Sequence, residues 1–215
     1  MPPPAPTPIV RFMHIDNLAV CLKLGGLHAP NHAPADWATY KTIHNVDVQK
    51  KRAVCKVDCA PGGVIHDYVA FYFGPLSPMM LQLKTGQVAG YNDGQDPLIY
   101  LVSHAQAVDK SGTAFVFSDG HGIATFTDWF NDLKDLDKVD WAVVNLRYWT
   151  DTLDDMDRQR RKQAEFLIHK FCNWSLISEI VVISESTKAQ VEAVLSGVSK
   201  HLRRPVGVRR DWYYW

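Results

Sequence analysis

The sequence lacks the cysteine spacing of a metal-binding or disulfide-rich protein. Its four cysteines form no Cys-x-x-Cys pair, and Cys55-x-x-x-Cys59 has no matching second pair. His28 and His32 have no acidic or cysteine companion at ligand spacing, and the acidic run at residues 151–157 lacks the glycine and the spacing of an EF-hand calcium loop. We therefore expect reduced, structural thiols and no metal site.

Long apolar runs and targeting segments are also missing. No stretch reaches the roughly 20 apolar residues that a membrane-spanning helix needs. The first eight residues are proline-rich and have neither the basic region nor the apolar region of a signal peptide. These absences predict a cytoplasmic protein with no membrane partner.

Several common catalytic signatures and an excess of one charge sign are absent as well. The sequence has no G-x-x-x-x-G-K-[ST], G-x-G-x-x-G, G-x-S-x-G or H-E-x-x-H pattern, which removes the simplest nucleotide-triphosphatase, dinucleotide-fold, serine-hydrolase and zinc-protease interpretations. The 23 basic and 23 acidic residues cancel. Basic clusters at residues 50–56, 158–162 and 203–210 could still form a positive groove if they converge in space.

The composition that is present fits one folded domain over residues 1–215. The hydrophobic fraction of 47% and the charged fraction of 21% are close to the averages of globular domains, and no repeat or long linker divides the chain. The predicted strands and helices do not alternate regularly, which favours an α+β fold over a doubly wound sheet. Strands are expected at residues 8–12, 68–73, 98–102, 114–117, 164–168, 179–183 and 206–209, and helices after Asn17 and at residues 47–56, 127–138, 141–149 and 187–200.

One carboxylate interrupts an otherwise apolar strand. Glu165 precedes Phe-Leu-Ile and follows a segment dominated by Arg and Lys. The simpler interpretation is an edge-strand Glu that pairs with a neighbouring Arg or Lys at the surface. Three other features favour a catalytic site, namely Arg11 in the first strand, Tyr72 in an aromatic strand and Arg52 in a basic loop.

Short blocks spread along nearly the whole chain strengthen this interpretation. They are residues 7–9 (Thr-Pro-Ile), 14–18 (His-Ile-Asp-Asn-Leu), 61–69 (Pro-Gly-Gly-Val-Ile-His-Asp-Tyr-Val), 71–73 (Phe-Tyr-Phe), 77–79 (Ser-Pro-Met), 115–117 (Phe-Val-Phe), 121–122 (His-Gly), 162–167 (Lys-Gln-Ala-Glu-Phe-Leu) and 209–214 (Arg-Arg-Asp-Trp-Tyr-Tyr). In this order the blocks resemble the DarT family, the DNA-modifying ADP-ribosyltransferase toxins of bacterial toxin–antitoxin systems. The resemblance implies an ADP-ribosyltransferase fold, in which two packed sheets form an NAD cleft with flanking helices.

The resemblance also implies roles for individual residues. Glu165 matches the catalytic Glu, Arg52 a catalytic Arg on the loop that meets the acceptor base, and Tyr72 the aromatic residue near nicotinamide. Arg11 departs from the His that is usual in this strand, and it can donate to a ribose hydroxyl or a phosphate more strongly than a neutral His. The expected NAD contacts are Arg11, Met13, His14, Asn17 and Tyr72, and the expected DNA contacts are Lys51, Met79 and His121.

The residue types suit the implied chemistry. Cleavage of the bond between ribose and nicotinamide builds positive charge on the sugar, which a fixed carboxylate stabilises. A cation beside the acceptor would favour the deprotonated ring nitrogen of a thymine. The implied partners are NAD as co-substrate, single-stranded DNA and a macrodomain antitoxin that reverses the modification.

Two other functions stay open at the level of sequence. A protein-modifying ADP-ribosyltransferase would share Glu165, Tyr72 and NAD but would present different acceptor loops. A non-catalytic nucleic-acid-binding module would use the aromatic strand at residues 68–73 as a stacking platform. Hydrolysis of NAD by the isolated protein separates the two enzymes from the binding module.

Overall fold

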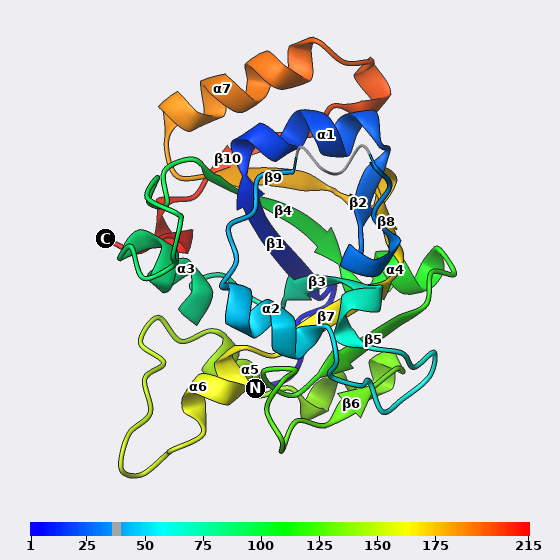
Figure 1. Ribbon diagram of the computed structural model, residues 1–215, viewed down its shortest axis with the longest axis vertical. Helices are drawn as coiled ribbons and strands as arrows, with labels where there is room; N and C mark the ends of the chain where they lie inside the picture. Colours follow the sequence, from blue (N-terminus) through cyan, green and yellow to red (C-terminus); the bar gives the residue numbers. More distant parts are fainter. Residues whose placement is uncertain (36–39) are drawn as a thin grey trace.

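The centre of the molecule is a mixed sheet of eight strands, seen in a computed structural model that describes residues 1–35 and 40–215 (Figure 1). The large sheet contains β1 (Pro8–His14), β3 (Tyr68–Tyr72), β4 (Leu98–His104), β5 (Phe115–Ser118), β6 (Trp129–Phe130), β7 (Glu165–His169), β9 (Glu179–Val182) and β10 (Val206–Val208). Its order is β10-β9-β4-β1-β3-β7-β5-β6. A second, small sheet pairs β2 (Gly26–His28) with β8 (Phe171–Asn173). The predicted α+β class is confirmed.

A weak seam divides the large sheet into two halves. Strand β1 pairs with β4 along its whole length, but it shares only one registered pair with β3, between Val10 and Tyr72. In Figure 1 the half formed by β10, β9, β4 and β1 lies above the half formed by β3, β7, β5 and β6. The large sheet is thus continuous but sparsely paired between β1 and β3.

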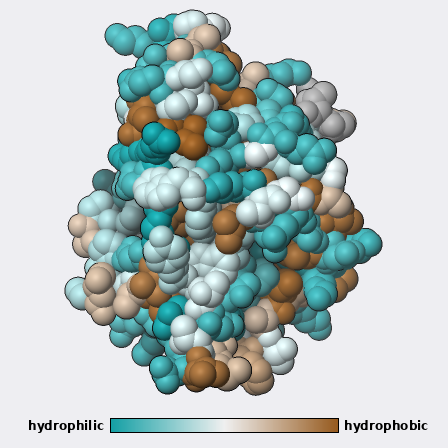
Figure 2. Space-filling view, turned by 90° about the vertical axis from the view of Figure 1, so that its left-hand side faces the viewer, coloured by the Kyte–Doolittle hydropathy of each residue, from teal (hydrophilic) through white to brown (hydrophobic). Residues whose placement is uncertain are grey.

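Seven helices surround the sheets in the described part of the chain. They are α1 (Leu18–Lys23), α2 (Val46–Arg52), α3 (Pro78–Lys84), α4 (Ala105–Lys110), α5 (Trp141–Val144), α6 (Arg158–Lys162) and α7 (Glu185–Ser196). Helices α1 and α7 lie together at the top of Figure 1, where α7 also contacts β9 and β10. Helix α2 lies in front of β3 and β7. The side that carries α3 and the C-terminus is largely hydrophilic, with separate apolar patches (Figure 2).

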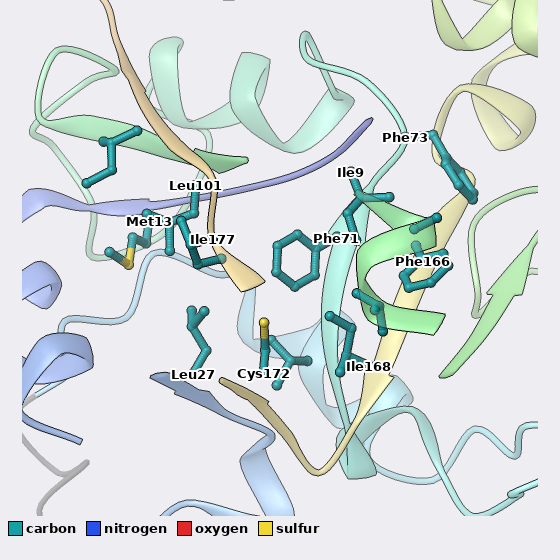
Figure 3. Packing of buried hydrophobic residues seen from close by; sticks show 14 of the residues in the cluster. Ile9, Met13, Leu27, Phe71, Phe73, Leu101, Phe166, Ile168, Cys172 and Ile177 are labelled. Carbon is teal, nitrogen blue, oxygen red and sulfur yellow. The ribbon is translucent and has the colours of Figure 1, made fainter. Parts of the chain in front are cut away.

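The core follows the alternation of side chains along the strands. Phe166 and Ile168 of β7 enter the main cluster, whereas Leu167 points to the opposite face. Leu27 and Cys172 of the small sheet point into the same main cluster (Figure 3). By the same alternation Glu165 lies on the face of Leu167, away from the main core. All four cysteines are free.

Some element predictions were wrong. Residues 127–138 form β6 and a 3-10 helix at Leu133–Lys138 rather than one α-helix. The helix predicted at residues 141–149 ends at Val144, because the Nζ of Lys162 takes up the carbonyl groups of Val144 and Leu146 that would otherwise continue the helix (2.6 and 2.8 Å). The short elements β2, β8, α3, α4 and α6 were not predicted.

Within residues 1–35 and 40–215, no helix has the length and the apolar character needed to cross a membrane. The single domain over residues 1–215 stays a prediction. It is supported by the large sheet, which takes strands from both ends of the chain.

Candidate active site

A pocket of about 530 Å³ opens beside the seam of the large sheet. Strands β1 and β3, helices α2, α3 and α6, and the segment that leads into α2 all contribute side chains to its wall. Six of the residues predicted from the sequence line it, namely Arg11, Arg52, Tyr72, Met79, His121 and Glu165. The fold therefore brings together residues that are up to 154 positions apart in the chain, from Arg11 to Glu165.

Arg52 and Glu165 form a buried, bidentate ion pair at the base of the pocket. The Nη1 of Arg52 donates to Oε1 of Glu165 at 2.8 Å, and its Nη2 donates to Oε2 at 2.7 Å. The two side chains are only 10% and 2% exposed. Arg52 is the last residue of helix α2, within the helix predicted at residues 47–56, so its description as a loop residue is corrected. Glu165 lies on a strand paired on both sides, which rules out the alternative of an edge-strand Glu.

The pair keeps both of its charges because each group compensates the other. Burial alone would raise the pKa of Glu165, but the charge and the two hydrogen bonds of Arg52 outweigh it and hold this pKa below its ordinary value. Burial likewise disfavours the charged guanidinium, and the carboxylate opposite it raises the pKa of Arg52 above the ordinary value. Glu165 is thus an ionised carboxylate in a largely dry site.

The loop that follows β5 fixes the carboxylate from the other side. The backbone N–H of Gly122 donates to Oε1 of Glu165 at 3.2 Å, and the backbone N–H of Glu165 donates to the hydroxyl of Ser118 at 3.2 Å. That hydroxyl donates in turn to the carbonyl of Gly120 at 2.7 Å. A Cβ at Gly120 would lie 2.3 Å from Nη1 of Arg160, so any larger residue there requires the Arg160 side chain or the loop to shift.

Tyr72 and His121 complete the surroundings of the ion pair. Tyr72 lies directly opposite Glu165 in the pairing of β3 with β7, so their side chains share one face of the sheet. Burial raises the pKa of Tyr72 to about 12, and its phenol stays protonated at neutral pH. Burial also lowers the pKa of His121. His121 therefore offers a neutral imidazole to the pocket near pH 7.

Arg11 reaches the pocket from the other side of the seam. Its Nη1 donates to the carbonyl of Ala70 in β3 at 2.8 Å, which ties β1 to β3 where their pairing is sparse. Its Nε is buried and has no hydrogen-bond partner among the described residues. A buried donor of this kind is costly unless a ligand or water satisfies it.

Four predicted residues do not line the pocket. Met13 is completely buried in the main core, where its Sδ lies 3.8 Å from Sγ of Cys21, so only its backbone could face a ligand. His14 caps the 3-10 helix that follows β1. The amide of Asn17 holds the backbone of Lys41 through two hydrogen bonds, at 2.6 and 2.9 Å.

Lys51, the fourth of these residues, is exposed on α2. Its charge is close enough to His121 to contribute to the lowered pKa of that residue. Lys51 therefore stands at the rim of the pocket rather than inside it.

Many cations of the three basic clusters have partners within the fold. Arg160 pairs with Asp119 and Asp157, and Arg161 pairs with Asp140 and Asp155. Lys162 is buried, and Arg209 pairs with Glu179. A groove built from all three clusters stays a prediction, and these ion pairs and carbonyl contacts leave few of the cations of residues 158–162 available for it.

Several pocket residues were not found from the sequence. The segment 42–45 lines the wall before α2, Gln159 lines it from α6, and Gln163 lines it from the C-cap of α6. The two glutamines are four positions apart, and the short helix that positions them was hidden in a charged segment. No group of three or more His, Cys, Asp or Glu side chains in the described residues could hold a metal ion.

Comparison with known proteins identifies the family. The sequence model of the protein family described as "ssDNA thymidine ADP-ribosyltransferase, DarT" matches residues 10–214. The chain belongs to the DarT family. A DNA ADP-ribosyl transferase of Thermus sp. (strain 2.9) is 41% identical over 211 residues, which cover 98% of each chain.

Solved structures of Thermus sp. 2.9 DarT share the fold of this DarT family member. The complex with ADP-ribosylated ssDNA has a TM-score of 0.93 at 40% identity and covers 100% of this chain and 99% of that one. The complex with NAD+ has a TM-score of 0.89, also at 40% identity, and covers 99% of this chain and all of that one.

Proposed function

We propose that Glu165 and Arg52 are the catalytic residues with which this chain transfers ADP-ribose from NAD to a thymine of single-stranded DNA. The chain is an NAD-dependent DNA ADP-ribosyltransferase by family. The observation that carries the assignment of residues is the buried pair of Arg52 and Glu165 at the base of the pocket. The related DarT complexes with NAD+ and with ADP-ribosylated ssDNA support both substrates.

Glu165 is assigned to the reacting sugar. In the transfer, the bond from ribose C1′ to the nicotinamide nitrogen breaks, nicotinamide leaves with the bonding electrons, and C1′ bonds to a ring nitrogen of thymine, which loses its proton. Positive charge develops on the ribose between these events, and an ionised carboxylate in a dry site stabilises it. The lowered pKa of Glu165 keeps that charge available.

The hydrogen bonds of the carboxylate leave room for the substrate. A carboxylate accepts about four hydrogen bonds. Oε1 accepts from Arg52 and from the N–H of Gly122, and Oε2 accepts from Arg52. One acceptor position on Oε2 thus stays available for a ribose hydroxyl.

Arg52 is assigned to the acceptor base. Its guanidinium has five N–H donors, of which Glu165 takes two. The remaining donors and the positive charge would favour the deprotonated form of a thymine ring nitrogen, which is the form that attacks. In this assignment Arg52 contacts both Glu165, which stabilises the ribose, and the thymine that accepts the ADP-ribose.

The other predicted contacts divide between the two substrates. On the NAD side we place Arg11, whose buried Nε lacks a partner among the described residues, and Tyr72 beside Glu165. Met13, His14 and Asn17 stay predicted NAD contacts, with Asn17 acting through the segment that it holds at Lys41. On the DNA side the contacts we propose are Lys51, Met79 and His121.

The experiment that tests this function is mass spectrometry of a single-stranded oligonucleotide incubated with the protein and NAD. Wild type should add one ADP-ribose to a thymine and release nicotinamide. Arg52→Lys keeps the charge but cannot form the bidentate pair, so it should lose base modification more than NAD hydrolysis. Modification of added protein instead of DNA would support the protein-modifying alternative, which the family does not favour.

Two further expectations complete the proposal. A macrodomain antitoxin that removes ADP-ribose from DNA is implied by the resemblance to toxin–antitoxin systems. A location in the cytoplasm is supported by the two substrates, since NAD and DNA are found together inside cells.

A further inference from the structure

The loop between β5 and β6, which contributes His121 to the pocket, also carries an exposed aromatic side chain with no role in the chemistry described above. Phe126 lies between β5 and β6 and is 85% exposed, among the most exposed of the large hydrophobic residues in the described chain. At this exposure the side chain adds little to the stability of the fold. An exposed aromatic residue can indicate a binding site if the chain holds it in a defined position.

The loop around Phe126 is held by several hydrogen bonds. The N–H of Ala124 donates to the carbonyl of His121 at 2.9 Å, and the hydroxyl of Thr127 donates to the same carbonyl at 2.8 Å. The N–H of Thr127 donates to the carbonyl of Ala124 at 3.2 Å. Phe126 is thus presented by a closed turn whose two ends are tied together at His121.

The same turn is part of the active site. His121 lines the pocket, and the neighbouring Gly122 donates to the carboxylate of Glu165. The hydroxyl of Thr127 donates to the carbonyl of His121, and Phe126 is the residue directly before Thr127, with Cα atoms about 3.8 Å apart. Phe126 is therefore held in the turn that begins at His121, a residue of the pocket wall.

We propose that Phe126 is a stacking site for the nucleobase adjacent to the thymine that is modified. The inference rests on the proposed DNA-modifying function and adds a second base contact outside the pocket. A phenyl ring stacks on the face of any base, so the site would hold the strand and set its register without reading a particular neighbour. Lys51 is exposed on α2 and its charge reaches His121, so it would supply a cation for a backbone phosphate of the bound strand.

The test compares oligonucleotides with one thymine whose neighbours are either normal bases or abasic sites. Wild type should bind and modify the normal oligonucleotide about tenfold better, because stacking of one base is worth about that factor or more. Phe126→Ala should lose this advantage, and Phe126→Trp should keep it. NAD hydrolysis without DNA and the melting temperature should not change, since the side chain is exposed.

Tyr148→Ala provides a matched control, because Tyr148 is also an exposed aromatic residue, at 79%. It should retain the preference for normal neighbours. If Phe126→Ala retains the full preference, or if Tyr148→Ala abolishes it equally, the stacking site is refuted. Failure of wild type to modify any oligonucleotide would refute the underlying function instead, so the two failures are distinguishable.

Discussion

At the scale of single residues, Arg52 and Glu165 depend on each other for both charge and position. Removing one partner of a buried pair leaves an uncompensated charge in a dry site, which typically costs about 3–5 kcal/mol of stability. An alanine at position 165 would therefore confuse loss of catalysis with loss of fold. Glutamine is the better test because it keeps the shape and one acceptor oxygen.

We predict that Glu165→Gln lowers the rate of ADP-ribose transfer by roughly 100-fold to 1,000-fold, the range found when one electrostatic stabiliser of a transition state is removed. Binding of NAD should change much less, because the carboxylate acts mainly on charge that develops in the reaction. Single-turnover kinetics and NAD titration measure the two effects separately. A variant with near wild-type turnover and reduced thermal stability would assign Glu165 a structural role only.

Lys162 gives a second prediction at this scale, one about stability. Burial lowers its pKa to about 8, and its Nζ donates to the carbonyl groups of Val144 and Leu146. A neutral amine still has the two N–H donors that these bonds need. Between pH 8 and the ordinary lysine pKa of about 10.4, the unfolded chain binds a proton that the folded chain does not, so the free energy of unfolding should rise with pH.

The full rise should be about 3 kcal/mol, which corresponds to the difference between the two pKa values. Urea unfolding at pH 8 and at pH 10 should capture about 2 kcal/mol of this rise, because the folded group is half-titrated at pH 8 and the unfolded group titrates above pH 10. Lys162→Met removes the titrating group, so the variant should be less stable at pH 10 but should lack this part of the pH dependence. An equal rise in wild type and variant would mean that other groups cause it.

At the scale of elements, the loop between β5 and β6 and the short helix α6 position the catalytic carboxylate. Arg160 joins them, because it pairs with Asp119 before the loop and with Asp157 at the start of the helix. The N–H of His121 also donates to the carbonyl of Arg160 at 3.0 Å. The loop and the helix therefore act as one support for Glu165 and His121.

Gly120→Ala tests this support. The added Cβ would lie 2.3 Å from Nη1 of Arg160, so the Arg160 side chain or the loop must shift. We expect transfer to fall roughly tenfold to a hundredfold, since displacements near 1 Å in a catalytic site cost up to that much. Gly120→Ala combined with Arg160→Ala should recover part of the loss, because the clash is then removed. No recovery would show that the glycine is needed for another reason.

The sequence predicted the elements of this site unevenly. The long strands with regular apolar character, such as β4 and β7, were predicted to within one or two residues at most ends. Helices α3 and α6 are short and stand next to proline or in charged segments, so apolar periodicity could not reveal them. The bidentate contact of Arg52 with Glu165 was also out of reach, because it depends on how α2 packs against β7 across 113 positions of the chain.

At the scale of the whole molecule, charge is balanced in number, and around α6 it is also balanced locally by ion pairs. The 23 basic and 23 acidic residues cancel, and most arginines near α6 are paired with aspartates. Lys51 and Lys56 form no ion pair within the described residues. Around the pocket, the cations of α6 are therefore largely neutralised, and Lys51 and Lys56 are cations near it that remain for a phosphate.

This charge distribution predicts the behaviour of the enzyme toward DNA. Modification should be confined to single strands, because base pairing covers the ring nitrogen that must react and extrusion of a paired base costs a few kcal/mol. The affinity for a single strand should fall with salt at a logarithmic slope near −2, since each neutralised phosphate contributes about −0.7 and only about three cations can act together. Matched single-stranded and duplex oligonucleotides, compared across a salt series, measure both effects. A slope steeper than about −5 would indicate an extended basic surface, and equal modification of the duplex would mean that the enzyme opens base pairs itself.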